Sequence, residues 1–159
     1  MKNDFESFDD VKEQLQGVDS FICTLGTLQK YGKDLFRRVD YEYPLRFGEL
    51  AKELNIPHYS LLTSSGANAN SCFNYLKVKG QLERDVKALD LAQLTLYQPG
   101  FIKNRRNDKR CMESCAACLP CIANVQAAHL GECILLHAIE MVTNEEFRGQ
   151  KGNLLVLNN

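Results

Sequence analysis

Helix-like and strand-like segments alternate three times within residues 9–98, and this alternation restricts the fold more than any other feature of the sequence. In the first kind of segment apolar residues recur every three to four positions, and in the second they form short continuous runs. The expected helices are residues 9–16, the segment that ends at Leu54, and "NYLKVKGQLERDVKAL"; the expected strands are residues 19–24, residues 59–63 and "LAQLTLYQ".

Three alternations without repeats or Gly/Ser-rich linkers predict an α/β fold, in which helices flank a parallel sheet and the crossovers are right-handed. The length of 159 residues suits one domain, taken as 1–159, with a single core. The C-terminal third is expected to contain helices around 111–119 and 122–142. A loop and the short apolar segment "NLLVLNN" are expected to follow.

Charge and hydropathy limit the partners that the chain is expected to have. The formal net charge is -1 and the basic run at 103–110 is short, so neither nucleic acid nor an anionic membrane is an expected partner. Polar residues interrupt the apolar stretch 116–139, which argues against a simple membrane span. The acidic segment "MKNDFESFDDVKEQL" lacks the features of a secretory signal, and a cytoplasmic location is therefore expected.

A lysine stands among the apolar residues of the third helix, which is expected to start near Asn70 and to include "NYLKVKGQLERDVKAL". At 100° per residue, Val78, Leu82 and Val86 form the stripe that packs on the sheet, and Tyr75 and Lys79 fall on the same stripe. A lysine at such a position is costly unless its charge has a partner or its stem reaches water. The first turn of this helix is expected over the carboxyl ends of the strands, where open α/β sheets bind ligands.

Proton transfer is the chemistry that suits this pair. A lysine ammonium one turn from a tyrosine stabilises the phenolate, which makes Tyr75 suitable as a general acid or base. A hydroxyl at the end of the preceding strand would orient a carbonyl substrate, and "LLTSSGA" supplies Ser64 and Ser65 there. A Tyr-x3-Lys pair also arises by chance, but a strand-end serine before it and a Pro-Gly strand end after it form a more specific order.

This order resembles the short-chain dehydrogenase/reductase superfamily in "TLGT", "LLTSSGA", "YLKVKG" and "YQPGFI". The segments "NDFESFDD", "FRRVDYEY" and "ELAKELNIPHYSLLTSSGA" are most similar to its atypical branch, the HIV Tat-interacting oxidoreductase-like family, over about residues 3–103. The resemblance implies a Rossmann-like fold, NADP or NAD as cofactor, and hydride transfer to a small carbonyl. It also implies protein partners in nuclear import and pro-apoptotic regulation, with a nuclear as well as a cytoplasmic location.

Carried over by position, the resemblance assigns site residues. Tyr75 and Lys79 resemble the family's active-site pair, with Tyr75 as proton donor or acceptor. Ser64 resembles the catalytic serine, with Ser65 as the alternative. No metal ligand is implied. The residues that resemble the family's cofactor contacts are Leu25, Gly26, Thr27, Tyr75, Lys79, Ile102 and Arg110.

One departure from the family pattern concerns the dinucleotide. The ten glycines form neither Gly-x-Gly-x-x-Gly nor Gly-x-x-Gly-x-x-Gly, the turn that holds a pyrophosphate at a helix N-terminus. The resemblance begins near Asp4, where the family has already completed three strands and two helices. The chain is therefore expected to be N-terminally truncated relative to the family, without its first strands. The strand at 19–24 then becomes a sheet edge, and marginal stability or aggregation is expected.

Four of the seven cysteines occur in "RCMESCAACLPC". Steps of four, three and three residues would place Cys111, Cys115, Cys118 and Cys121 on one side of a helix. One continuous helix rarely surrounds a zinc ion, because zinc sites usually pair a Cys-x2-Cys turn with a distant second pair. An apolar helix face is the favoured interpretation, and a metal site with His129 as a further ligand is the alternative.

Three hypotheses for the function follow. The first is an NAD(P)H-linked short-chain reductase in which tyrosine donates the proton. The second is a non-catalytic, truncated family member that acts through protein contacts, and the missing Gly-rich turn favours it. The third is a small metal module built on the cysteine cluster.

Overall fold

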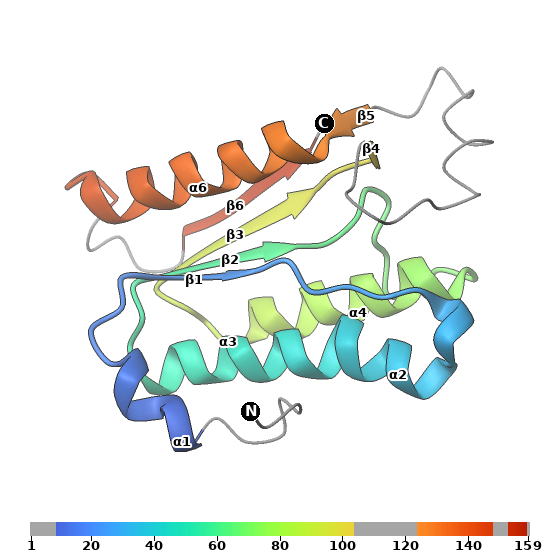
Figure 1. The fold of residues 1–159 in the computed structure, drawn as a ribbon, viewed down its shortest axis with the longest axis horizontal. Helices are drawn as coiled ribbons and strands as arrows, with labels where there is room; N and C mark the ends of the chain where they lie inside the picture. Colours follow the sequence, from blue (N-terminus) through green and yellow to red (C-terminus); the bar gives the residue numbers. More distant parts are fainter. Residues whose placement is uncertain (1–8, 104–123, 148–152, 159) are drawn as a thin grey trace.

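Four parallel strands form the central sheet (Figure 1). The computed structural model describes residues 9–103, 124–147 and 153–158. In the register, Tyr59 lies opposite Phe21 on one side and Leu94 on the other. The strands are β1 (Ser20–Cys23), β2 (His58–Leu62), β3 (Gln93–Gln98) and β6 (Asn153–Asn158), in the spatial order β1-β2-β3-β6. The predicted α/β class with a parallel sheet is confirmed.

Helices cover both faces of this sheet (Figure 1). The helices α2 (Lys33–Arg37), α3 (Tyr43–Glu53) and α4 (Asn74–Ala88) lie on one face, and α6 (Ala127–Thr143) lies on the other. Short elements complete the described chain: α1 (Asp9–Lys12), the 3-10 turns η1 (Glu13–Leu15) and η2 (Gln29–Tyr31), and the π-helical turn η3 (Arg38–Glu42). No helix within the described ranges combines the length and the apolar character needed to cross a membrane.

The main core lies between the sheet and the layer formed by α3 and α4. Leu50 of α3 and Leu82 of α4 are fully buried and belong to one apolar cluster with Leu61 and Leu96 of the sheet. Full burial of side chains of this size stabilises the fold by about 1.5–3 kcal/mol each. β2 and β3 are nearly continuous buried runs, as expected for parallel strands that are covered on both faces.

Two predicted helices begin later than expected. The helix expected near Asn70 begins at Asn74, because Asn68 and Ser71 accept backbone N–H groups of the preceding turn through their side chains. The helix expected over 122–142 begins at Ala127. The three residues before it form β5 (Asn124–Gln126), which pairs in parallel with β4 (Phe101–Lys103) as a second, two-stranded sheet. The helix expected at 111–119 lies outside the described residues.

The strand expected at a sheet edge is indeed one edge of the described four-stranded sheet. Phe21 and Cys23 are buried against the α3 layer, and the Phe21 ring stacks on Phe47 with a centroid distance of 4.3 Å. Ile22 points to the other face and is 38% exposed. β1 is therefore buried on one face only, which explains why its sequence is apolar although it lies at an edge.

Candidate functional site

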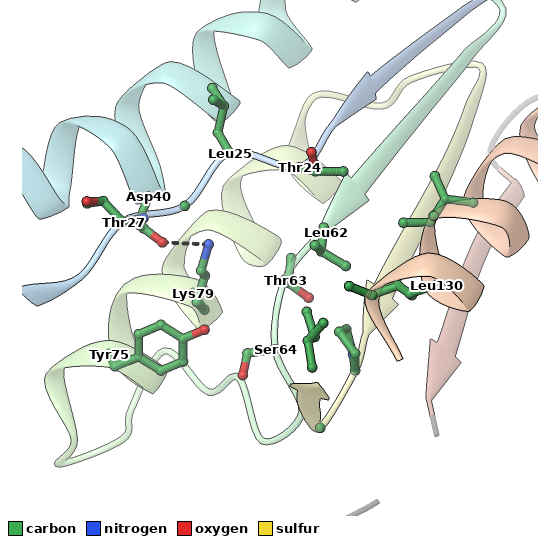
Figure 2. A pocket seen from close by; sticks show the side chains of 17 residues that line it. Thr24, Leu25, Thr27, Asp40, Leu62, Thr63, Ser64, Tyr75, Lys79 and Leu130 are labelled. Carbon is green, nitrogen blue, oxygen red and sulfur yellow. Dashed lines mark hydrogen bonds and ion pairs between the residues drawn. The ribbon is translucent and has the colours of Figure 1, made fainter. Parts of the chain in front are cut away.

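A cavity of about 380 Å³ opens at the carboxyl ends of β1, β2 and β3 (Figure 2). Its volume falls within the range of small-molecule sites. Polar side chains come from α4 and from the strand ends, and the first turns of α6 supply apolar ones. The lining residues are Thr24, Leu25, Gly26, Thr27, Asp40, Leu62, Thr63, Ser64, Tyr75, Lys79, Pro99, Gly100, Ile102, Ala127, Leu130, Gly131 and Ile134.

Tyr75, Lys79 and Ser64 meet at this cavity. Tyr75 and Lys79 are one turn apart near the start of α4, and Ser64 lies two residues beyond the end of β2. Figure 2 shows the Tyr75 hydroxyl on the side of Ser64, and the Lys79 ammonium next to them directed toward Asp40. The Tyr75 ring is half-buried and contacts Phe36, with ring centroids 6.0 Å apart. The sequence-predicted trio is thus brought together, while the catalytic roles assigned to it stay a prediction.

The charge of Lys79 has a partner, as its apolar surroundings require. Its Nζ lies 2.8 Å from Oδ1 of Asp40, and the two side chains are only 4% and 1% exposed. The second oxygen of Asp40, Oδ2, accepts the backbone N–H of Thr27 at 2.7 Å. A buried ion pair persists when further hydrogen bonds satisfy its remaining atoms, and Thr27 provides such a bond.

A second buried carboxylate lies under the wall of the cavity. Glu83 of α4 accepts a hydrogen bond from the Thr63 hydroxyl at 2.6 Å and bonds from the Gln98 amide at 2.8 Å. The Thr63 hydroxyl is therefore hydrogen-bonded to Glu83, although Thr63 lines the cavity. Of the serines in "LLTSSGA", only Ser64 is among the cavity-lining residues, and its hydroxyl donates a hydrogen bond of 3.3 Å to the backbone carbonyl of Ser65.

The predicted cofactor-contact residues divide into two groups. Leu25, Gly26, Thr27 and Ile102 line the cavity together with Tyr75 and Lys79. Arg110 lies outside the described residues. Sequence reasoning missed Asp40, although it stands in the family-like segment "FRRVDYEY", because no spacing links it to Lys79. It also missed the apolar wall formed by Leu130 and Ile134 of α6, which only the packing of that helix creates.

The metal hypothesis is not tested by this structure, because Cys111, Cys115, Cys118 and Cys121 lie outside the described residues. His129 is exposed in the first turn of α6. Within the described part of the chain, no three His, Cys, Asp or Glu side chains are arranged to hold a metal ion.

Two histidines form a separate polar cluster on the face of the sheet that α6 covers. His58 is fully buried, with Nδ1 at 3.0 Å from Ser20 Oγ and Nε2 at 2.9 Å from Thr95 Oγ1. Burial, with a smaller contribution from His137, lowers the pKa of His58 to about 4. His137 Nδ1 lies 2.9 Å from the Tyr97 hydroxyl. The cluster is internally hydrogen-bonded and does not line the cavity.

Comparisons with known proteins show to which family this chain is related. No family model matches it. It is 42% identical to Protein HTATIP2 of Rattus norvegicus over 108 residues, which are 67% of this chain and 45% of the relative. It is 34% identical to the mitochondrial protein FMP52 of Debaryomyces hansenii over 98 residues, 60% of this chain and 43% of the relative. The chain is a homologue of the HTATIP2/FMP52 family. The resemblance to the HIV Tat-interacting family is thereby confirmed, and the chain spans somewhat less than half the length of these relatives.

Solved structures show which fold this HTATIP2/FMP52 homologue has. MoeE5 in complex with UDP-glucose and NAD matches with a TM-score of 0.70 and 12% identity, over 100% of this chain and 62% of that one. A UDP-N-acetylglucosamine 4-epimerase from Bacillus cereus matches with a TM-score of 0.68 and 14% identity, over the same shares. The fold of the homologue is therefore that of NAD-dependent epimerases and dehydratases.

Proposed function

We propose that this chain provides the proton-transfer side of an NAD(P)-linked oxidoreductase site that acts on a small carbonyl or alcohol. The observation that carries the proposal is that Tyr75, Lys79 and Ser64 line one cavity at the carboxyl edge of a parallel sheet. The homology to HTATIP2 and FMP52, and the fold shared with structures described in complex with NAD, support the same reaction class.

The lining residues fit the nicotinamide and ribose end of a dinucleotide. A lysine ammonium has three N–H donors, and Asp40 takes one from Lys79, so donors remain for ribose hydroxyls. Pro99 and Ile102 offer apolar surface to a flat ring, and the loop Leu25–Thr27 lines the same space. When bound, the nicotinamide would supply or accept the hydride. We assign only this end of a dinucleotide to the described residues.

The side chains then have distinct tasks. Tyr75 donates its phenolic proton to the carbonyl oxygen as the carbonyl carbon receives the hydride, and the product is an alcohol. Ser64 orients the carbonyl oxygen through its hydroxyl. The Lys79 ammonium stabilises the phenolate that Tyr75 becomes. In the reverse direction Tyr75 takes the alcohol proton while the hydride leaves the carbon.

The wall opposite these groups favours a compact substrate with an aliphatic or aromatic part. Leu130 and Ile134 of α6 line the cavity and present apolar side chains to it. Among the described lining residues the charged ones are Asp40 and Lys79, and they neutralise each other. A neutral carbonyl compound fits such surroundings better than an anion does.

Cofactor binding is tested first, by calorimetric titration of NADPH and, separately, of NADH into the purified chain. Tyr75→Phe removes the phenolic hydroxyl from the cavity. Tyr31→Phe is the matched control, because Tyr31 is 60% exposed and lies outside the cavity. We expect both variants to bind the dinucleotide like the unchanged chain. Reduction of 4-nitrobenzaldehyde, followed by loss of NADPH absorbance, should fall about 100-fold or more in Tyr75→Phe and stay unchanged in Tyr31→Phe.

Two results would contradict this function. A chain that is folded by circular dichroism and binds neither NADPH nor NADH has no oxidoreductase site, which would leave the partner-binding hypothesis from the family resemblance. Equal turnover by Tyr75→Phe and the unchanged chain would remove Tyr75 from the reaction.

A further inference from the structure

Asp40 contacts two parts of the cavity that are distant in sequence. It belongs to η3, which packs against α4, and its side chain is 1% exposed. Oδ1 contacts the Lys79 ammonium on α4 at 2.8 Å, and Oδ2 accepts the N–H of Thr27, beyond the end of β1, at 2.7 Å. Figure 2 shows Asp40 between the loop that carries Thr27 and the side chain of Lys79.

The loop passes close to this carboxylate. A Cβ atom added to Gly26 would lie 3.4 Å from Asp40 Oδ1, so Gly26 and Thr27 follow the outline of the carboxylate closely. Each carboxylate oxygen has a different partner, one on a helix and one on a loop. Moving the carboxylate would therefore displace the ammonium and the loop together.

We propose that Asp40 is a positioning residue that holds the Lys79 ammonium and the backbone of Leu25–Thr27 in a fixed relation across the cavity. The proposal rests on the oxidoreductase function proposed above, because that function gives both elements a task at the cofactor. The bond to Asp40 fixes the direction of one ammonium proton, so the other two are left for the cavity. The bond to Thr27 keeps the strand-end loop against the same space.

Chemistry explains why a carboxylate suits this position. An ionised aspartate accepts hydrogen bonds at both oxygens, whereas an asparagine has one accepting oxygen and one donating amide group. Asp40→Asn keeps nearly the same shape but turns an N–H group toward either Lys79 or Thr27. Charge-assisted hydrogen bonds are about twice as strong as neutral ones, so the variant weakens both links.

The test compares Asp40→Asn with Glu83→Gln by hydrogen exchange and nuclear magnetic resonance. Glu83 is a matched control, because it is also a buried carboxylate beside the cavity but holds Thr63 and Gln98 instead. In Asp40→Asn we expect amide exchange of Thr27 to accelerate about tenfold or more and the slowly exchanging ammonium signal of Lys79 to be lost. Both signals should persist in Glu83→Gln.

A second measurement needs no variant. In the unchanged chain, a long-range correlation from the Thr27 amide nitrogen to the Asp40 carboxyl carbon reports their hydrogen bond directly. Its absence, or unchanged Thr27 exchange in a folded Asp40→Asn, would overturn the proposal. The cofactor titration separates the two ideas. If the unchanged chain binds no NADPH, the proposed function fails. If Asp40→Asn nevertheless accelerates the amide exchange of Thr27 and removes the ammonium signal of Lys79, the positioning role of Asp40 stands.

If the chain binds NADPH, the affinity gives a functional readout. Because Lys79 and the loop both lie where the ribose would bind, Asp40→Asn should raise the Kd for NADPH about tenfold. Asp40→Glu restores the charge and should recover part of that affinity, which a merely structural loss would not show. Equal Kd values for the unchanged chain and Asp40→Asn would count against the positioning role.

Discussion

The cavity edge and the histidine cluster both bury polar side chains in the same sheet, but they use them differently. In the histidine cluster, His58 is held between Ser20 and Thr95, and the hydrogen-bonding groups contact one another inside the fold. At the cavity edge the buried pair of Lys79 and Asp40 is satisfied, yet Tyr75 and Ser64 next to it face open space. A buried polar group therefore indicates a site only where neighbouring groups remain directed at a cavity.

The largest expected effect comes from breaking the ion pair on the cavity side. Asp40→Ala leaves the Lys79 charge buried without its partner, and we expect a loss of about 3–5 kcal/mol in the free energy of unfolding. The double variant Asp40→Ala with Lys79→Met should recover much of this loss, since no buried charge remains. Urea denaturation of the three proteins measures both changes. If the double variant is as unstable as Asp40→Ala, the unpaired charge of Lys79 is not the cause of the lost stability.

The next largest expected loss of stability comes from crowding the backbone beside the cavity. A Cβ added to Gly80 of α4 would lie 2.2 Å from backbone atoms of Asn68 and Ala69, in the turn between Ser64 and Tyr75. We expect Gly80→Ala to lower the free energy of unfolding by roughly 3 kcal/mol. Gly131 of α6 has nothing within 4 Å of an added Cβ, so Gly131→Ala should stabilise by about 0.5–1 kcal/mol. Thermal unfolding measures the stability of both variants. A Gly80→Ala variant as stable as the unchanged chain would contradict the close packing at Gly80.

The histidine cluster should respond to pH. His58 has a pKa of about 4 in the folded chain, below its ordinary value of about 6.5, because burial disfavours the imidazolium. The neutral form therefore stabilises the fold above pH 6.5, and this contribution is lost as the pH falls toward 4. Linkage gives a loss of about 2.5 kcal/mol between pH 7.5 and 4.5.

Urea denaturation at both pH values measures this loss, and His58→Gln is the comparison. The variant cannot protonate at this position, so its stability should change less over the same interval. Burial also lowers the pKa of His137, which adds to the effect in the same direction and persists in His58→Gln. Equal pH dependence in the two proteins would remove His58 as the main cause.

The smallest expected loss of stability comes from removing one hydrogen bond of the histidine cluster. Tyr97→Phe removes the hydroxyl that lies 2.9 Å from His137 Nδ1, and a loss of about 1 kcal/mol is expected. Tyr75→Phe is the counterpart at the cavity and should cost less, because its hydroxyl faces open space. Urea denaturation of both variants makes the comparison. A larger loss for Tyr75→Phe would mean that its hydroxyl has a structural partner.

Most of the fold could be predicted from the sequence because helix and strand periods are local. Three rounds of helix and strand were placed to within a few residues, and the edge position of the strand at 19–24 was expected from the family resemblance. The errors lie at helix starts. Asn68 and Ser71 form hydrogen bonds that delay α4, and residues 124–126 pair with β4 instead of joining α6. Both helix starts depend on contacts that the hydrophobic pattern within one segment does not reveal.

The sequence by itself determined the type and order of the elements, and it showed that a lysine on an apolar stripe needs a partner. The tertiary structure decided which partner it has. Glu83, one turn further along α4, is the local choice for Lys79, yet it accepts bonds from Thr63 and Gln98 instead. Lys79 is paired with Asp40, because η3 packs against α4 and brings that carboxylate to it. Helical periodicity is a property of neighbouring residues, whereas a buried ion pair depends on how separate segments pack.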